Sequence, residues 1–281
     1  MLSSIRLTNT GKIPLSLYSI GGLSLVLNFI ECPLNCGSCP WESNIGRRSA
    51  RLIEFNPQIV VKLAKQYDVD IIFLHGAEPY NYISYDDVKR IKDESNIAIG
   101  LKINPLIAEN NSRFTSMINF IDVALFEIVL NSDIELQTTS LMHIMHSSIV
   151  QFKHIEIAIV VMDSKDNLTL IKTLKNVINI IKKNDIPINI VLIDNTYKVF
   201  DINLISRIRE EHPLIQIPTA EVFENASTIC PRCKNVVIIR RGGIVYKANI
   251  NDMGKCIFCG YKLANSMSKK LVKLPLDIPL V

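Results

Sequence analysis

Apolar runs rich in β-branched residues recur at regular intervals along the first two thirds of the chain. Amphipathic segments with 3.6-residue apolar spacing lie between them, and Ser84 and Asn167 are suited to cap two of these helices. The expected strands are residues 23–30, 69–76, 97–104, 123–130, 155–163 and 188–194, and the clearest helices are residues 56–67, 84–95 and 167–184. Strands that alternate with helices in this way predict an α/β fold with a parallel sheet.

The alternation is compatible with two architectures, a partial or full barrel and an open doubly wound sheet, because periodicity alone does not choose between them. No G-x-G-x-x-G motif follows any of the expected strands, so a dinucleotide-binding version of the open sheet has no support. Near residues 218–224 the pattern changes to short β segments and paired cysteines. We therefore expect two domains, residues 1–222 and residues 223–281.

The chain has seven cysteines among 281 residues, of which 48% are apolar. It contains no run of roughly 20 uncharged apolar residues, and its first residues lack the features of a signal peptide. We expect a cytoplasmic protein that does not contact the membrane, in which the thiols are reduced. Metal binding then explains the cysteines better than disulfide bonds do.

Three cysteines, Cys32, Cys36 and Cys39, directly follow the first expected strand in the run E-C-P-L-N-C-G-S-C-P-W. A loop after a strand lies at the carboxyl end of a parallel sheet, where α/β folds place their chemistry. Three thiolates at these spacings can supply three of the four iron ligands of a 4Fe-4S cluster and leave one iron open. A zinc site completed by a distant ligand such as His75 is the less favoured interpretation.

At these residues the chain resembles the radical S-adenosylmethionine superfamily, whose signature is a C-x3-C-x2-C loop after the first barrel strand. A second likeness is the sequence His75-Gly76-Ala77-Glu78-Pro79 after the next strand, which is similar to the Gly-Gly-Glu-Pro element that holds the methionine amino group in that family. The resemblance implies that Gly76, Ala77, Glu78 and Pro79 contact S-adenosylmethionine. Glycine suits close backbone approach, and a carboxylate suits an ammonium group.

The resemblance also implies an activity. The enzyme would cleave S-adenosylmethionine reductively at a 4Fe-4S cluster, and the resulting 5′-deoxyadenosyl radical would abstract hydrogen from a substrate. An electron donor such as ferredoxin or flavodoxin would supply the electron. Among the polar residues at the strand ends, Lys102 and Asn104 lie where related enzymes hold the carboxylate and the ribose, and Asn167 lies in a region that often meets the nucleoside. The remaining strand-end candidates are Glu127, Asp163, Asp194 and Asn195.

The other four cysteines form two C-x-x-C pairs, Cys230 with Cys233 and Cys256 with Cys259. Two short β runs around a Gly-Gly pair separate them, which predicts a hairpin between two cysteine knuckles. Four thiolates placed in this way form a zinc-ribbon or rubredoxin-like site. Zinc is the first choice of metal, and a second iron site is the alternative.

A radical barrel followed by such a module resembles the group called AmmeMemoRadiSam, which is related to pyruvate formate-lyase activating enzymes. The resemblance implies a partial (β/α)6 radical SAM barrel followed by a small zinc-ribbon or rubredoxin-like β module. The likeness to activating enzymes suggests a protein, peptide or RNA as the substrate, whose identity the residues do not give.

The charge of the chain is unevenly distributed. Residues 230–281 hold ten Lys and Arg against Asp252 and Asp277, while the whole chain has a net charge of +4. A solvated basic surface is the commoner reason for such a count. The alternative function is a non-catalytic zinc protein whose basic ribbon binds nucleic acid, although few aromatic residues interleave with the charges there.

Overall fold

The computed structural model describes residues 1–30, 52–130, 134–148, 152–161, 167–181, 185–192, 202–264, 267–268 and 270–280. Within this part of the chain, no helix combines the length and the apolar character that crossing a membrane requires.

Helices follow most of the strands between β2 and β8 along the chain. The strands are β1 (Leu2–Asn9), β2 (Leu23–Phe29), β3 (Ile71–Gly76), β4 (Ala98–Ile103), β5 (Val123–Val129), β6 (His154–Val161), β7 (Ile188–Leu192), β8 (Ile215–Gln216), β9 (Thr228–Ile229), β10 (Val236–Arg241), β11 (Ile244–Ala248) and β12 (Asp277–Pro279). The helices are α2 (Pro57–Gln66), α3 (Tyr85–Ser95), α4 (Pro105–Ala108), α5 (Ser112–Met117), α6 (Ile134–Ser148), α7 (Asn167–Ile181), α8 (Ile202–Glu211) and α9 (Phe223–Ala226), with 3-10 turns η1 (Thr10–Lys12), η2 (Pro79–Asn81) and η3 (Ile118–Phe120).

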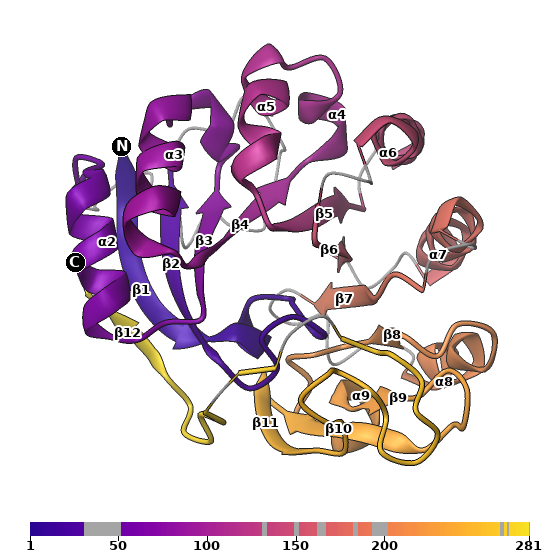
Figure 1. Ribbon diagram of the computed structural model, residues 1–281. Coiled ribbons are helices and arrows are strands. Elements are labelled where there is room, and N and C mark those ends of the chain that lie inside the picture. The colour runs from indigo at the N-terminus through magenta and orange to yellow at the C-terminus, as the bar shows by residue number, and fades with distance from the viewer. Residues whose placement is uncertain are drawn as a thin grey trace.

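Nine strands form one curved sheet in the order β12-β1-β2-β3-β4-β5-β6-β7-β8. The strands from β2 to β8 pair in parallel, as the alternating sequence pattern predicts. The six strands expected from the sequence are all present, and the helices lie along the outer side of the curve (Figure 1). The α/β class is therefore confirmed, whereas the strand order of the described residues is linear and does not show a closed barrel.

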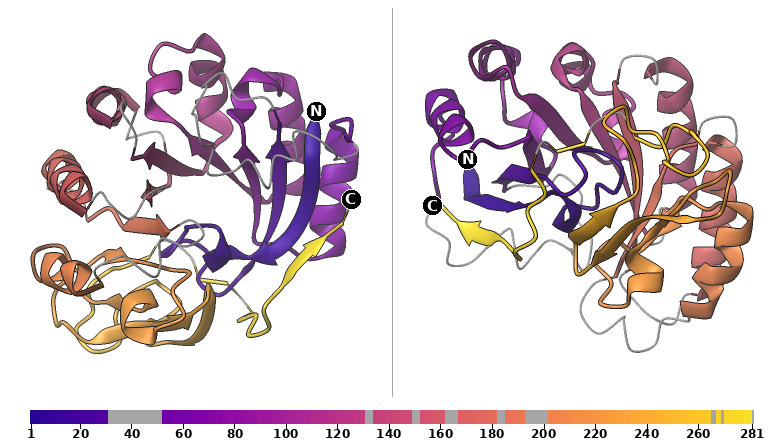
Figure 2. Two further views of the ribbon diagram at one scale, coloured as in Figure 1. Left: turned by 180° about the vertical axis from the view of Figure 1, so that it is seen from behind. Right: turned by 60° about the horizontal axis from the view of Figure 1, so that its bottom comes forward.

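The two strands at one edge of the larger sheet, β1 and β12, were not expected from the sequence. β1 pairs antiparallel with β2, and β12 pairs antiparallel with the other edge of β1, with Leu7 opposite Ile278. Figure 2 shows β12 beside β1, close to where the two ends of the chain lie. The larger sheet therefore includes residues from both sides of the expected domain boundary, which itself stays a prediction.

Local capping explains where two of the helices begin. Asn56 precedes Pro57 of α2, and its side chain accepts hydrogen bonds from the backbone N–H groups of Gln58 and Ile59 at 2.9 and 3.3 Å. Ser84, expected as a cap, accepts from the backbone N–H of Asp87 at 3.1 Å. Such caps satisfy donors that the first turn of a helix leaves unpaired.

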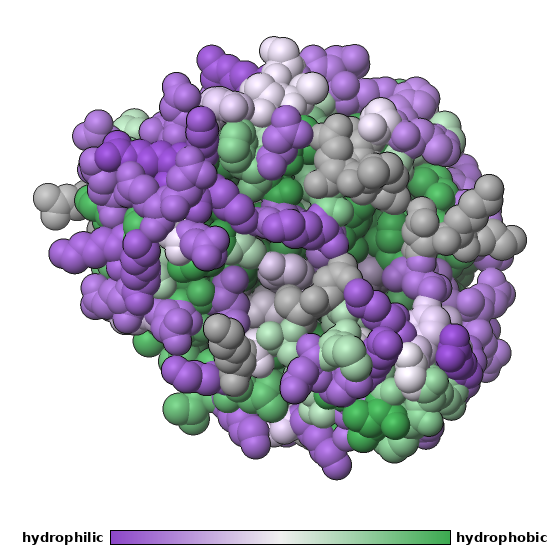
Figure 3. All heavy atoms as spheres, in the orientation of Figure 1, coloured by the Kyte–Doolittle hydropathy of each residue, from purple (hydrophilic) through white to green (hydrophobic). Residues whose placement is uncertain are grey.

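The two faces of the sheet differ in composition. Strand side chains such as Leu27, Leu74 and Leu101 pack with the helices in the main core. On the inner face, residues of the β1–β2 connection, among them Ile13 and Leu15, pack over the strands in a smaller cluster. Hydrophilic side chains cover α2 and α3 on the face shown in Figure 3. The inner face of the sheet is thus the face opposite the helices, and polar residues on it lie among apolar neighbours.

A three-stranded sheet, β11-β10-β9, forms the core of the second module. β10 and β11 make the expected hairpin, and its turn contains Gly242 and Gly243 with φ of 55° and 78°. Both values lie in the left-handed region, which glycine adopts without a steric penalty. Figure 1 shows this module beside β7 and β8, at one end of the curved sheet.

Candidate active site and metal centre

Polar side chains form a band on the inner face of the sheet, near the carboxyl ends of four neighbouring strands. The band contains Asn28 on β2, His75 on β3, Lys102 on β4 and Glu127 on β5, all buried. Side chains alternate between the faces of a strand, so apolar neighbours such as Leu101 point to the helices instead. Buried polar groups in such a row need partners, and their contacts define the site.

Glu78 follows β3 and is fully buried. Its carboxylate accepts hydrogen bonds from Lys102 Nζ at 2.6 Å, the Tyr80 hydroxyl at 2.7 Å and the backbone N–H of Asn104 at 3.1 Å. Three donors from two neighbouring strand ends fix the carboxylate in one orientation. The sequence selected Glu78, Lys102 and Asn104 separately, and the structure brings them into direct contact.

Lys102 lies between two carboxylates. Its Nζ is 2.6 Å from Glu78 Oε1 and 3.5 Å from Glu127 Oε1. Lys102 therefore links two carboxylates at the ends of neighbouring strands.

His75 is held by Asn28, whose Oδ1 lies 3.0 Å from His75 Nδ1. Burial, together with the positive charge of Lys102, lowers the pKa of His75 to about 3. The imidazole is therefore neutral at pH 7, and it separates the charged group around Lys102 from the β1–β2 side of the inner face.

The Gly76-Ala77 backbone packs directly against the end of β2. Gly76 has a φ of 87°, and a Cβ atom there would lie 2.4 Å from the Phe29 carbonyl oxygen. The same carbonyl accepts a hydrogen bond from the backbone N–H of Ala77 at 3.0 Å. Only glycine fits this close approach, and Pro79 then begins η2. The packing holds the start of the Gly-Ala-Glu-Pro element beside the strand that leads to the first cysteines.

The other expected site residues lie at the strand ends or outside the described residues. The side chain of Asn104 caps α4, because its Oδ1 accepts from the backbone N–H of Leu106 at 3.0 Å. Asn167 is the first residue of α7. Residues outside the described ranges are Cys32, Cys36, Cys39, Asp163, Asp194 and Asn195.

The four cysteines of the second module come together. Cys230 Sγ lies 3.6 Å from Cys259 Sγ, and Cys233 Sγ lies 3.7 Å from Cys256 Sγ. All four sulfur atoms lie within 4.8 Å of one another. A tetrahedral site with metal–sulfur bonds of about 2.3 Å requires sulfur atoms about 3.8 Å apart, so the donor set fits a metal ion of this kind.

The two knuckles have the same backbone pattern. Lys234 N–H donates to the Cys230 carbonyl at 3.0 Å, and Gly260 N–H donates to the Cys256 carbonyl at 2.8 Å. Lys234 and Gly260 both have positive φ, 59° and 73°. Equivalent turns present the two cysteine pairs to a common centre, as the C-x-x-C spacing predicts.

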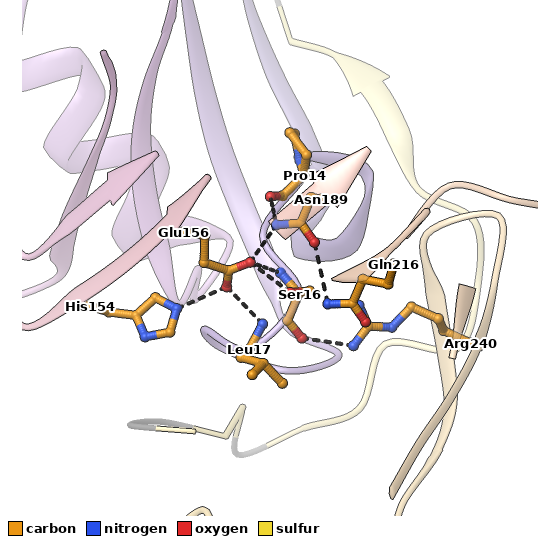
Figure 4. Close-up of polar contacts among 8 residues, drawn as sticks. All are labelled: Pro14, Ser16, Leu17, His154, Glu156, Asn189, Gln216 and Arg240. Carbon is orange, nitrogen blue, oxygen red and sulfur yellow. Dashed lines mark hydrogen bonds and ion pairs between the residues drawn. The ribbon is translucent and has the colours of Figure 1, made fainter. Parts of the chain in front are cut away.

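Another buried carboxylate, Glu156 on β6, was not selected from the sequence. It accepts from Ser16 N and Oγ and from Leu17 N, each at 2.7 Å, and from Asn189 Nδ2 at 2.6 Å, and His154 Nε2 lies 2.8 Å away (Figure 4). Burial raises the pKa of Glu156, but the contacts with His154 and Ser16 outweigh burial and hold it below its ordinary value. A glutamate within an apolar strand was the signal that could have identified it.

Arg240 of β10 joins this network from the second module. It is fully buried, and its Nη2 donates to the Ser16 carbonyl at 2.7 Å (Figure 4). Its Nε and Nη1 have no hydrogen-bond partner among the described residues. Burial lowers the pKa of Arg240 to about 10, and the negative charge of Glu156 opposes that shift. The Glu156 carboxylate and Arg240 thus hold the same short segment around Ser16.

Comparisons with known proteins do not assign the chain to a family. No protein-family model matches the chain, and no curated protein matches it. Among solved structures, SuiB of Streptococcus suis is similar, with a TM-score of 0.44 and 12% sequence identity over 66% of this chain. The match covers 47% of SuiB, so this chain spans about half of its length. A likeness this distant carries no argument about activity.

Proposed function

We propose that the chain is a radical S-adenosylmethionine enzyme in which Cys32, Cys36 and Cys39 hold a 4Fe-4S cluster. One contact carries the proposal. The Phe29 carbonyl, three residues before Cys32 in the sequence, accepts the backbone N–H of Ala77 at 3.0 Å. The strand that leads into the cysteine run and the Gly-Ala-Glu-Pro element are therefore adjacent at the carboxyl end of the sheet, where α/β folds place their ligands.

The charge of the inner face supports the choice of cofactor. S-adenosylmethionine carries a sulfonium and an ammonium against one carboxylate, so its net charge is positive. Two buried carboxylates, those of Glu78 and Glu127, lie at neighbouring strand ends and suit such a ligand. In this proposal Lys102 acts mainly by orienting Glu78, because its ammonium group already contacts both carboxylates.

The chemistry that the cluster supplies when bound is one-electron reductive cleavage of S-adenosylmethionine, with an electron from a ferredoxin or flavodoxin. The residues of this chain bind and orient. Tyr80 and the Asn104 backbone hold the Glu78 carboxylate in place, and the packed inner face limits access of water. Asn104 and Asn167 are proposed to contact the nucleoside. The substrate is proposed to be a protein, peptide or RNA.

The four-cysteine module is proposed to hold zinc in a structural role. The sulfur separations of 3.6 and 3.7 Å suit a closed tetrahedral site. A module of this size has a small core, and a metal compensates for it. A second iron site would use the same thiolates, so metal analysis of the purified protein decides between them.

The test is production of 5′-deoxyadenosine. The full chain is purified without oxygen, reconstituted with iron and sulfide, and mixed with dithionite and S-adenosylmethionine, and the product is measured by mass spectrometry. We expect product with the wild type, none with Cys32→Ala, and wild-type levels with Glu94→Gln, which alters an exposed ion pair on α3. Glu78→Gln should weaken S-adenosylmethionine binding about tenfold or more through loss of a charged acceptor.

Two outcomes would overturn the proposal. Product that forms equally with Cys32→Ala would separate the chemistry from the first cysteines. A protein that contains zinc alone, forms no product and binds RNA in a salt-sensitive manner would instead favour the nucleic-acid-binding alternative.

A further inference from the structure

A cavity of about 140 Å³ lies on the inner face of β1 and β2, on the far side of His75 from Lys102. Arg6, Thr8 and Lys12 line one side, and Asn28 and His75 line another. A water molecule occupies about 30 Å³ of liquid, so the cavity has room for a small organic group. It continues the polar band of the inner face and is not part of the contacts around Glu78.

Two cationic side chains and one anionic side chain line this cavity. Arg6 and Lys12 are cationic and Asp277 is anionic, so its lining has a net charge of +1, since His75 is neutral with a pKa of about 3. Arg6 is already paired, because its Nε and Nη2 both lie 2.9 Å from Asp277 Oδ1. Lys12 has no ion-pair partner among the described residues, which leaves its ammonium group available to a ligand.

We propose that this cavity binds a carboxylate group, held by Lys12 and, when it is drawn away from Asp277, by Arg6. A single net positive charge matches a monoanion better than a phosphate dianion. Thr8 and Asn28 give the cavity neutral polar walls. The assignment of this carboxylate to the substrate rests on the proposed radical function, with the cationic cofactor on the Lys102 side and the anionic end of the substrate on the Lys12 side.

Asp277 is the acidic residue in the lining of this cavity. It belongs to β12, the three-residue edge strand, and it competes with any incoming carboxylate for Arg6. Removal of its charge should therefore strengthen carboxylate binding, whereas removal of the Lys12 charge should weaken it. Opposite effects of two nearby substitutions distinguish a binding site from a general loss of folding.

Binding is measured with glutaramate, a monoanion, and with glutaramide, its neutral isostere, by ligand-detected nuclear magnetic resonance on the full chain. We expect glutaramate to bind and glutaramide not to bind. Lys12→Ala should lower the affinity about three- to tenfold, and Asp277→Asn should raise it about two- to fivefold, the range for charge-assisted contacts of half-exposed groups. The controls are Lys62→Ala on the exposed side of α2 and Asp252→Asn on the exposed surface of the module, which should leave binding unchanged.

Three results would overturn the inference: equal binding of glutaramate and glutaramide, tighter binding of inorganic phosphate than of glutaramate, or an unchanged affinity in both Lys12→Ala and Asp277→Asn. Because the measurement uses neither cluster nor cofactor, its failure is separate from failure of the proposed function. Carboxylate binding without any 5′-deoxyadenosine formation would keep the cavity assignment and remove the radical chemistry.

Discussion

Two of the buried glutamates beside the larger sheet, Glu78 and Glu156, are held in different ways. Glu78 lies beyond the carboxyl end of β3, and its partners are Lys102, Tyr80 and a backbone N–H of the next strand end. Glu156 lies near the amino end of β6, and it holds the β1–β2 connection through Ser16 and Leu17. The first carboxylate is fixed by neighbours along the sheet, and the second fixes a segment distant in sequence.

The different partners of Glu78 and Glu156 indicate that the two buried carboxylates have different roles. Glu156 has polar contacts on both oxygens and has Arg240 of the second module nearby, so its loss disconnects three parts of the chain. Glu78 belongs to a group at the strand ends in which Lys102 contacts two carboxylates. We interpret the Glu156 network as structural and the Glu78 group as the part that a ligand meets.

The largest expected effect follows Glu156→Ala. The substitution removes the common acceptor of Asn189 Nδ2, the Ser16 hydroxyl and the backbone N–H groups of Ser16 and Leu17, so we expect a loss of about 3–5 kcal/mol in the free energy of unfolding. Urea denaturation followed by circular dichroism measures it. The exposed control Glu94→Ala should change stability by less than about 0.5 kcal/mol. If Glu156→Ala fails to fold, Glu156→Gln provides the value, and a loss below about 1 kcal/mol would contradict the structural role.

A smaller loss is expected for Lys102→Met, because Glu78 keeps two donors after the ammonium group is removed. We predict about 2–3 kcal/mol, and the double variant with Glu127→Gln should recover part of it by removing one of the two carboxylates that lose their contact with Lys102. The same denaturation experiment measures both variants, with Lys65→Met on the exposed side of α2 as the control. A double variant that is less stable than the single one would show that Glu127 needs no cation.

Metal removal tests whether the second module supports the Glu156 network. Arg240 belongs to the module hairpin, so stripping the metal with a chelator should lower the stability of the wild type by more than that of Glu156→Ala. The expected difference is about 1–2 kcal/mol, the size typical of coupled sites. Equal losses in the two proteins would mean that the hairpin stays in place without metal.

The pH dependence of stability should differ in sign between the buried Glu156 and the half-buried Asp70. The pKa of Glu156 is held below its ordinary value of 4.5, so its contribution is fully present above that pH and is lost as the pH falls through the folded-state pKa. Asp70 behaves in the opposite way: burial raises its pKa, so its ionisation reduces stability as the pH rises. The free energy of unfolding is measured for the wild type, Glu156→Gln and Asp70→Asn from pH 3 to pH 7, about the range in which carboxyl groups titrate. We expect the stability difference between the wild type and each variant to change with pH in opposite directions. Differences that do not change with pH would contradict both assignments.

The smallest effect is expected for Ser84→Ala, which removes a helix cap far from both glutamates. A cost of about 0.5–1 kcal/mol is expected, since one N-terminal donor of α3 loses its acceptor. This value gives a baseline for an ordinary local contact. A loss as large as that of Lys102→Met would mean that the buried pair contributes no more than a cap.

Local patterns in the sequence predicted the central strands, the Ser84 cap, the Gly-Gly hairpin and the convergence of the last four cysteines. Each depends on residues close together in the chain, where spacing determines geometry. β1 and β12 were missed because their pairing joins segments at opposite ends of the sequence. The contact of Lys102 with Glu78 could not be predicted either, since position at a strand end does not say which polar neighbours pair.

The Glu156 network was missed for a related reason. A glutamate in a buried strand signals that partners exist, but it does not name them. Here they come from the β1–β2 connection, from β7 and, through Arg240, from the second module. Only the folded arrangement brings these groups together.

The pairing of β12 with β1 has a consequence for synthesis on the ribosome. Their contacts join residues 268 positions apart, such as Thr8 and Leu276. At about 5–20 residues per second, roughly 13 to 54 seconds pass between translation of the two strands. During that interval one edge of β1 has no partner from β12, and an open edge can pair with other chains. Arg6, at that edge, gives the nascent protein a charge that discourages such pairing until Asp277 is made.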